Sequence, residues 1–408
     1  MPDSTPAVPA LLRALHVRAR ALGTGPPAAF LGDWRDSPAV IIPSVDLRPT
    51  RPEQVFSVVG DLVVVGFRSF PDHVPDDAPL LPAAVRGTAT GMLTLDPDGR
   101  WRGDGTAPDP HEVIRRYGPP SSGGAGDTRG DGDEGDDDEL GIPLTWAAPD
   151  RRAHRRAVVD CLEAIRAGEV YQTCLSTRLD GRLRADPLET FLSLARRAPA
   201  ARSAYLEGEW GAVLAFSPEE FLVRTGDDVR TSPIKGTVPA DRDPAQLLAS
   251  AKDVAENIMI VDLARNDLGR VADVGSVRVS ELLAVRPAPG VHHLVSTVTA
   301  RTSVDHDALV AATFPPASVT GTPKQRAREL IAGWEPRSRG LHCGTYGFAT
   351  ADTLDLAVAI RTLEVAPDGR CELGVGGGIT IDSDPDAEWD ECVHKAAFTW
   401  GGGPAPWL

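Results

Sequence analysis

Three Asp-Pro pairs divide the second part of the chain into helices and clusters of strands. They are Asp186-Pro187, Asp243-Pro244 and Asp384-Pro385. Aspartate is favoured as a helix N-cap and proline in the first helical turn, so each pair predicts the start of a helix. The apolar β-type runs between these helices follow one another in antiparallel-looking clusters. The sequence therefore favours a mixed α+β fold over a doubly wound parallel sheet.

Composition divides the chain into three regions. Residues 1–117 contain short β-type runs, punctuated by proline and glycine, and no chemical motif, so we expect a scaffold or regulatory region there. Residues 118–147 are rich in glycine and acidic residues, and such a segment cannot bury enough apolar surface to order itself. We expect a disordered insert and linker. Residues 148–400 have the clearest periodicity and are predicted to form the principal domain.

The net charge of −16 limits the partners of the chain. It argues against nucleic acid and against an anionic membrane surface. No apolar run is long enough to span a bilayer, and the first residues lack the pattern of a signal peptide. The five cysteines are scattered and form no Cys-x-x-Cys motif, which argues against structural zinc and is typical of a reducing compartment. We therefore expect a cytoplasmic protein.

One lysine stands in a predicted strand–turn–strand region, in the stretch Ser232-Pro233-Ile234-Lys235-Gly236-Thr237. The ordinary interpretation is that its side chain extends from a strand end to solvent. The alternative is that the amine points into a pocket, because desolvation favours the neutral, nucleophilic form of an amine. The stretch alone favours the first interpretation, and the rest of the chain favours the second.

Four carboxylates form two pairs, each spaced so that both side chains share one face of a helix. The pairs are Asp253 with Glu256 and Glu388 with Glu391. Each pair alone is most often a solvated helix face. Two such faces opposite each other would form an all-oxygen site of the kind that Mg²⁺ prefers. Lys395 lies one turn after Glu391 and could neutralise a carboxylate.

Other residues are unusual for their predicted positions. Glycines from Gly376 to Gly378 allow a strand to approach a ligand closely, although a β-bulge or tight packing would also explain them. Arg361 lies in a predicted strand, where a carboxylate clamp would account for it. His292 and His293 face opposite ways in a strand, so at most one of them should line a pocket.

Three boundaries follow from local patterns. A long helix is predicted from 244 to 266, and a continuous strand from 356 to 365. Thr322 is the predicted N-cap of a helix that begins at Pro323, with Gln325 completing a capping box. The first amides of that helix could hold an anion.

Taken together, these segments resemble the chorismate-utilising enzymes, over residues 150–397. Within that family, Pro-Ile-Lys-Gly-Thr resembles aminodeoxychorismate synthase component I, whereas anthranilate synthases have alanine in place of the lysine. The motifs that carry the resemblance are Gly168-Glu169-Val170-Tyr171-Gln172, Phe216-Ser217-Pro218-Glu219, Pro233-Ile234-Lys235-Gly236-Thr237, 256–267, His293-Leu294-Val295-Ser296, Thr320-Gly321-Thr322-Pro323-Lys324 and Asp382-Ser383. The resemblance implies two packed antiparallel β-sheets flanked by helices, with residues 148–400 as the chorismate-binding catalytic domain.

The resemblance also implies a reaction. Lys235 would attack ring carbon 2 of chorismate while the 4-hydroxyl leaves, and ammonia would add at carbon 4 and displace the lysine. Glu219 would protonate the leaving hydroxyl, and His293 matches the family's active-site histidine. The product would be 4-amino-4-deoxychorismate. A separate glutamine amidotransferase would supply the ammonia, because the chain has no Gly-x-Cys-x-Gly nucleophile elbow.

The same resemblance implies a set of ligand-binding residues. Glu256 and Glu391 match the family's Mg²⁺ ligands, with Asp253 and Glu388 beside them, and the metal would hold the ring carboxylate of chorismate. The residues implied to bind the substrate are Gly236, Thr237, Thr320, Arg361, Gly376, Gly378 and Lys395.

The chain departs from the family pattern at several positions. His342 stands where anthranilate synthases have a substrate-contacting tyrosine, Cys174 replaces a commoner asparagine, and Thr322 replaces a commoner alanine. The tyrosine contact is therefore not carried over, and the role of His342 is left open. Residues 1–117 match weakly, which also leaves open whether they bind a regulatory amino acid.

Two rival interpretations are kept. Anthranilate synthase component I would need no lysine nucleophile and would release a different product. A non-catalytic chorismate-binding regulatory subunit would need neither the acid nor the nucleophile that the chain carries. The sequence does not distinguish folate (para-aminobenzoate) biosynthesis from secondary metabolism, and it does not give the oligomeric state.

Overall fold

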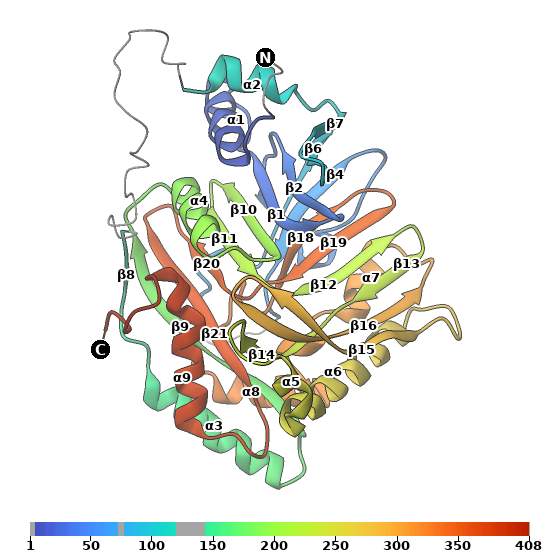
Figure 1. The fold of residues 1–408 in the computed structure, drawn as a ribbon, viewed down its shortest axis with the longest axis vertical. Helices are drawn as coiled ribbons and strands as arrows, with labels where there is room; N and C mark the ends of the chain where they lie inside the picture. Colours follow the sequence, from blue (N-terminus) through green and yellow to red (C-terminus); the bar gives the residue numbers. More distant parts are fainter. Residues whose placement is uncertain (1–4, 72–76, 120–142, 408) are drawn as a thin grey trace.

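The computed structural model describes residues 5–71, 77–119 and 143–407, which form two large antiparallel β-sheets packed face to face, with helices outside them (Figure 1). This arrangement confirms the predicted fold class. Most of the acidic insert predicted at 118–147 lies outside the described residues. None of the helices in the described part of the chain has both the length and the apolar character needed to cross a membrane.

Among the described residues, the first sheet has eleven strands. In spatial order they are β17 (Gly321–Thr322), β9 (Gln172–Leu183), β21 (Arg370–Ile379), β20 (Thr362–Val365), β11 (Gly211–Ser217), β10 (Arg202–Gly208), β1 (Ala28–Trp34), β2 (Ser37–Ile42), β6 (Gly91–Leu95) and β7 (Trp101–Gly105), with β8 (Leu144–Trp146) also beside β9.

The second sheet has ten strands in the described ranges. In spatial order they are β14 (Ile234–Pro239), β16 (Val291–Arg301), β13 (Asp228–Thr231), β12 (Glu220–Thr225), β19 (Thr353–Val358), β18 (Thr345–Ala349), β4 (Val63–Arg68), β5 (Ala84–Ala89) and β3 (Arg48–Pro49), with β15 (Arg278–Ala288) also beside β16.

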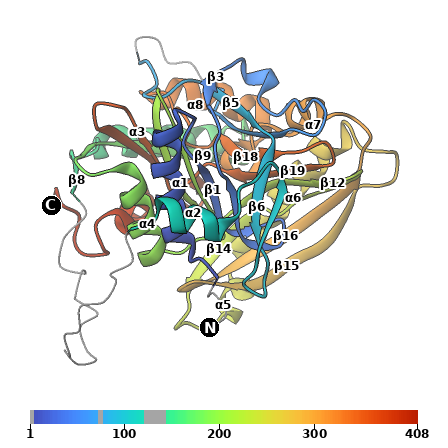
Figure 2. The ribbon, with the colours of Figure 1, turned by 90° about the horizontal axis from the view of Figure 1, so that it is seen from above.

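Apolar side chains from both sheets meet in a shared core, where the rings of Phe30 and Phe348 lie 5.1 Å apart. Helices cover the outer faces (Figure 2). Those packed against the first sheet and its β9 edge are α1 (Val8–Leu22), α2 (Pro110–Tyr117), α3 (Arg151–Arg166), α4 (Pro187–Arg197), α8 (Lys324–Trp334) and α9 (Pro385–Ala396). Those packed against the second are α6 (Ala251–Gly269) and α7 (His306–Thr313). The short elements are α5 (Ala245–Ala249), η1 (Pro52–Gln54), η3 (Ala317–Val319) and η4 (Ala397–Thr399).

The strands before residue 117 belong to both sheets. β1, β2, β6 and β7 extend the first sheet, and β3, β4 and β5 extend the second. β1 pairs with β10, and β4 pairs with β18. The regional boundaries at 117 and 148 stay predictions, but the amino-terminal strands continue the sheets of the rest of the chain.

The predicted helix from 244 to 266 is wrong, because two helices occupy this segment. Ser250 has extended backbone dihedrals, ends α5 and begins α6. Its Oγ accepts a hydrogen bond from the backbone N–H of Asp253 at 3.2 Å, as an N-cap does. Ser250 followed three residues later by Asp253 is a pattern that predicts a helix start. The prediction instead used the Asp243-Pro244 pair upstream as the start of a single helix.

The predicted cap at Thr322 is also wrong. Gly321 and Thr322 form β17 and pair with Thr173 and Gln172 of β9. α8 therefore begins at Lys324, with Pro323 at the N-cap position and no side-chain cap. Pairing with a distant strand outweighed the local capping pattern.

The predicted strand from 356 to 365 is two strands in different sheets. β19 belongs to the second sheet and β20 to the first, and the chain crosses between them at residues 359–361. Arg361 lies at this crossing with a φ of +49°, so it is not a strand residue. The apolar pattern is the same on both sides of the crossing and does not reveal it.

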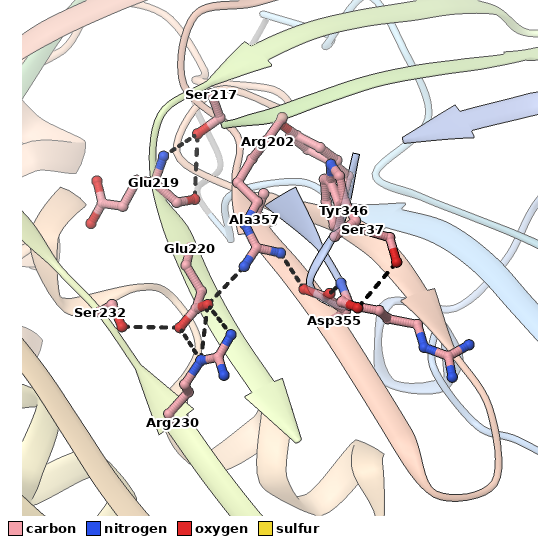
Figure 3. Close-up of polar contacts among 12 residues, drawn as sticks. Ser37, Arg202, Ser217, Glu219, Glu220, Arg230, Ser232, Tyr346, Asp355 and Ala357 are labelled. Carbon is pink, nitrogen blue, oxygen red and sulfur yellow. Dashed lines mark hydrogen bonds and ion pairs between the residues drawn. The ribbon is translucent and has the colours of Figure 1, made fainter. Parts of the chain in front are cut away.

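A buried charged cluster joins the two sheets (Figure 3). The guanidinium of Arg202, on β10, forms ion pairs with Asp355 of β19 and with Glu220 of β12. Its carbon Cζ also lies 4.9 Å from the ring centre of Trp34. Arg230 forms a second ion pair with Glu220 at 3.0 Å. The side chains of Arg202 and Asp355 are only 3% and 1% exposed, so each charge depends on the other.

We expect Asp355→Ala to destabilise the protein by about 3 kcal/mol, because it leaves the buried guanidinium of Arg202 with only one of its two acidic partners, Glu220. Asp46→Ala is the matched control, since Asp46 and Arg48 form an ion pair with side chains more than half exposed. Its loss should leave the stability almost unchanged. Urea unfolding of both variants measures the difference, and equal costs would contradict a structural role for the buried pair.

Candidate active site

A cavity of about 1040 Å³ lies where the β9–β21 end of the first sheet meets the β14–β16 end of the second, beside α6 and α9. It gathers side chains from distant parts of the sequence. The predicted site residues that line it are Glu219, Lys235, Gly236, Thr237, Asp253, Glu256, His293, Arg361, Gly376, Gly378, Glu391 and Lys395. His342 and Cys174, which depart from the family pattern, line it as well.

A β-bulge positions Lys235 on the wall of this cavity. Ile234 pairs with Val295, and the next pair is Thr237 with His293, so β14 carries one more residue than β16 over this step. A bulge turns a side chain away from the direction that regular pleating would give it. Lys235 lies within the bulge, and its side chain lines the cavity.

Close packing fixes the surroundings of this lysine. Gly236 has a φ of +83°, which residues with a Cβ rarely adopt, and a Cβ there would lie 3.1 Å from the side chain of Asp253. The Nζ of Lys235 donates a hydrogen bond to the backbone oxygen of Ser318 at 3.1 Å. A Cβ on Gly378 would lie 3.3 Å from the same Nζ. The amine is therefore held between β21 and the turn at η3.

The carboxyl group of Glu219 lies in the same cavity and has a raised pKa. It is only 4% exposed, and burial raises the pKa of Glu219 to about 7, although Ser318 and the charge of Lys235 act in the opposite direction. Figure 3 shows its carboxyl group directed away from that of Glu220, which binds Arg202. At neutral pH this carboxyl group is protonated for much of the time and can donate a proton.

The glycine-rich strand β21 passes between the two acidic helices. A Cβ on Gly377 would lie 3.0 Å from Oε2 of Glu388 and 3.3 Å from Oε1 of Glu391, both on α9. A Cβ on Gly378 would lie 3.2 Å from Oε2 of Glu256, on α6. The acidic faces of α6 and α9 therefore both lie against β21, which brings the two predicted acidic pairs together. The absence of side chains at its glycines leaves room for the carboxylates.

These carboxylates fit a divalent cation. Burial raises the pKa of Glu256, the positive charges of Lys235 and Lys252 oppose this rise, and the nearby Asp253 and Glu388 add to it. Oε2 of Glu388 is buried without a hydrogen-bond partner in the described ranges. No three His, Cys, Asp or Glu side chains of the described residues form a ready metal cluster. A cation held by Glu256 and Glu391 would complete its shell with water or substrate oxygens, as Mg²⁺ does.

Positive charge lies on the other walls. Arg361 is half-buried, and burial lowers its pKa. Within the described residues, its guanidinium has no hydrogen bond and no ion pair, which leaves it available to an anionic ligand. Lys395 donates to the oxygen of Gly376 and forms an ion pair with Glu391, both at 2.6 Å. Burial alone would lower the pKa of Lys395, but Glu391 outweighs it and the pKa is raised.

Two of the histidines that line the cavity, His293 and His342, have lowered pKa values and are neutral at physiological pH. Burial, with the positive charge of Arg361, lowers the pKa of His293 to about 4. Its Nδ1 lies 2.8 Å from Oγ1 of Thr237, and its neighbour His292 is not a lining residue, as predicted for a strand. Burial, with Arg339, lowers the pKa of His342 to about 3.

Two predicted site residues do not line the cavity, and Ser318 and Lys252 are among the lining residues that were not predicted. The hydroxyl of Thr320 bonds to the backbone of its own turn, and the Oε1 of Glu388 accepts from Ser383. Ser318 gave no sequence signal. Lys252 forms ion pairs with Glu256 and Glu388, at 3.9 and 3.6 Å, and its spacing of four residues from Glu256 could have identified it.

The family model described as chorismate binding enzyme matches residues 136–400. The chain belongs to this family. The match includes every predicted site residue and confirms the resemblance drawn from the motifs.

Curated relatives include two named groups. Aminodeoxychorismate synthase component 1 of Klebsiella aerogenes is 45% identical over 241 residues, 57% of this chain and 53% of that protein. Anthranilate synthase component 1 of Streptomyces coelicolor is 43% identical over 245 residues, 57% of this chain and 48% of that protein. The match thus spans about half of the length of these relatives.

Solved structures support the fold. Anthranilate synthase component I from Streptococcus pneumoniae has a TM-score of 0.72 at 24% identity, covering 85% of this chain and 84% of that one. The menaquinone-specific isochorismate synthase of Escherichia coli also has a TM-score of 0.72, at 18% identity, covering 98% and 91%. The second match includes the amino-terminal strands, in agreement with their place in both sheets.

We expect Lys235→Met to raise the pKa of Glu219 above its value of about 7, because the variant removes a positive charge that favours the ionised carboxylate. Carbon NMR of the protein labelled at glutamate side-chain carboxyls measures this pKa, with Glu219→Gln assigning the signal. Arg242→Met, in an exposed turn, is the control and should leave the pKa unchanged. A signal that titrates in the ordinary carboxyl range would contradict the buried, protonated Glu219.

Proposed function

We propose that this protein is component I of an aminodeoxychorismate synthase, which converts chorismate and ammonia to 4-amino-4-deoxychorismate. One observation carries the proposal. The amine of Lys235 binds the backbone oxygen of Ser318, and the carboxyl group of Glu219 interacts with the same serine and with the charge of Lys235. A nucleophile and a proton donor thus share one wall of the cavity. The similarity to named aminodeoxychorismate synthases supports the same assignment.

The proposed chemistry needs both groups. The nitrogen of Lys235, in its neutral form, forms a bond to ring carbon 2, the two conjugated ring double bonds shift, and the bond from carbon 4 to its oxygen breaks. Hydroxide is a poor leaving group, so Glu219 gives its proton and water leaves. Ammonia then bonds to carbon 4, both double bonds shift back, and the lysine nitrogen leaves carbon 2. A proton returned to Glu219 restores the starting state.

The remaining side chains bind and orient the substrate. Arg361 and Lys395 offer positive charge to the carboxylates of chorismate, and β21 offers backbone amides where the glycines permit close approach. Mg²⁺, bound between Glu256 and Glu391, would neutralise the ring carboxylate. Neutral His293, held by Thr237, would contact the substrate without adding charge. The ammonia would come from a glutamine amidotransferase partner in a cytoplasmic pathway.

A second candidate is anthranilate synthase component I, favoured by the 43% identity to a protein of that name. It would release anthranilate and would have no need for a nucleophile at position 235. The non-catalytic alternative is not favoured, because a binding subunit has no use for a carboxyl group with a pKa of about 7 beside an amine.

We expect the wild-type protein, with chorismate, Mg²⁺ and an ammonium salt, to release 4-amino-4-deoxychorismate, identified by mass spectrometry. Lys235→Ala should lower the rate by a factor on the order of a thousand, because it removes the nucleophile. It should still bind chorismate in the presence of Mg²⁺, as measured by calorimetry. Arg242→Ala is the control. An unchanged rate in Lys235→Ala would exclude the covalent route, and anthranilate as product would favour the second candidate.

We also expect Gly378→Ala to weaken chorismate binding, by roughly tenfold or more in Kd, because the added methyl group fills space among three side chains, two of which line the cavity. It would lie 2.8 Å from Nε2 of Gln172, 3.2 Å from Glu256 and 3.3 Å from Lys235. Gly333→Ala, in α8 with no atom within 4 Å, is the matched control and should bind normally. Calorimetry gives both Kd values, and equal affinities would show that β21 does not contact the ligand.

A further inference from the structure

Lysine is rare in this chain, and most of its lysines lie at the cavity. Of the 42 lysines and arginines, only Lys235, Lys252, Lys324 and Lys395 are lysines. Three of these four line the cavity, and the fourth, Lys324, forms an ion pair with Asp267 instead. An ammonium group is a compact point charge on a flexible chain, whereas a guanidinium group is a planar fork. The chain therefore places nearly all of its compact cations at this site.

The three cavity lysines differ in how firmly they are held. The Nζ of Lys235 donates a hydrogen bond to the backbone oxygen of Ser318 at 3.1 Å, and that of Lys395 donates to the backbone oxygen of Gly376 at 2.6 Å. Lys252 makes no hydrogen bond to any residue that the structure describes, and its side chain is 41% exposed. Lys252 is therefore the cavity lysine that can move most easily.

Lys252 lies between the carboxylates of two helices. Its Nζ is 3.9 Å from Oε1 of Glu256, on its own helix α6, and 3.6 Å from Oε1 of Glu388, on α9. The side chains of these two glutamates are only 9% and 5% exposed. The ammonium group thus reaches from solvent to two buried carboxylates and supplies part of the positive charge that they need.

A divalent cation would compete with Lys252 for the same oxygens. A cation bound between Glu256 and Glu391 would lie close to an ammonium group that is itself 3.9 Å from Glu256, and the two positive charges would repel each other. Oε2 of Glu388 is buried and has no hydrogen-bond partner in the described ranges, so this carboxylate also has an oxygen to offer. Ion pairs as long as those of Lys252 are weak, and a divalent cation should outcompete them.

We propose that Lys252 is an exchangeable counter-cation, which holds Glu256 and Glu388 while no divalent cation is bound and which a divalent cation displaces into solvent. Lys252 would then be a positioning residue that keeps the acidic faces of α6 and α9 together and weakens the affinity for the metal. This role rests on the metal site of the proposed function, but it does not depend on the reaction.

The first test follows the accessibility of Lys252 in the full-length protein. Wild type is treated with a limiting amount of acetic anhydride at one pH, with and without saturating Mg²⁺, and acetylation at each of the four lysines is measured by peptide mass spectrometry. We expect Mg²⁺ to increase acetylation of Lys252 roughly threefold or more, because the amine leaves its two carboxylates for solvent. Lys324 does not line the cavity, and it is the internal control that should not change.

The second test measures the affinity for Mg²⁺ by calorimetry. Lys252→Met should bind Mg²⁺ roughly tenfold more tightly than wild type, because no ammonium group competes for the carboxylates. Lys252→Arg keeps the positive charge and should bind Mg²⁺ more weakly than Lys252→Met. Arg370→Met is the matched control, since it removes a cation that pairs with Asp368 at the other end of β21 from the glycines, and its Kd should equal that of wild type.

Three outcomes would overturn the proposal. Mg²⁺ could bind to wild type without changing the acetylation of Lys252, Lys252→Met could bind Mg²⁺ no more tightly than wild type, or neither protein could bind Mg²⁺. A lysine that only supports the fold would give one of the first two results. Neither test needs turnover, so a protein that shows both effects but releases no 4-amino-4-deoxychorismate would refute the proposed function alone.

Discussion

Buried charge joins the two sheets of this protein and fixes the direction of its candidate acid. Arg202 reaches from the first sheet to Asp355 and Glu220 of the second, and these three side chains are 3%, 1% and 11% exposed, so bulk water can do little to replace their partners. Glu220 is thereby held on one side of β12. Its neighbour Glu219 is directed to the other side, as Figure 3 shows, and lines the cavity. The geometry of the site thus depends on an ion-pair cluster that contacts no ligand.

The cavity itself is a balance of opposed charges in a small volume. Carboxylates from α6 and α9 share this cavity with the side chains of Lys235, Lys395 and Arg361. Burial makes ionisation costly for all of them, and the partners that each group finds decide its state. Glu391 has Lys395 and a lowered pKa, whereas Glu219, with weaker compensation, has a raised pKa. One cavity therefore holds carboxyl groups suited to different tasks.

Sequence reasoning predicted the residues of the site better than their backbone. The two acidic pairs, Lys235 and His293 are placed as predicted, because helix spacing puts each acidic pair on one face, strand alternation turns His293 inward, and the family motif identified Lys235. The bulge at Lys235, the crossing at Arg361 and the pairing of Thr322 were not predicted, because distant strands impose them. A family motif alone predicted that Thr320 binds the substrate. In the structure its hydroxyl instead donates a hydrogen bond to the backbone oxygen of Ala317, within its own turn.

The amino-terminal strands constrain how the first part of the chain can change in evolution. β1 covers the edge of β10 and β4 covers the edge of β18, so each sheet continues across the boundary of the family match. Shortening the chain to that match would leave two long apolar edges unpaired, and such edges recruit other chains. The weakly matching first part can therefore drift in sequence, but it cannot be lost or exchanged as an independent module.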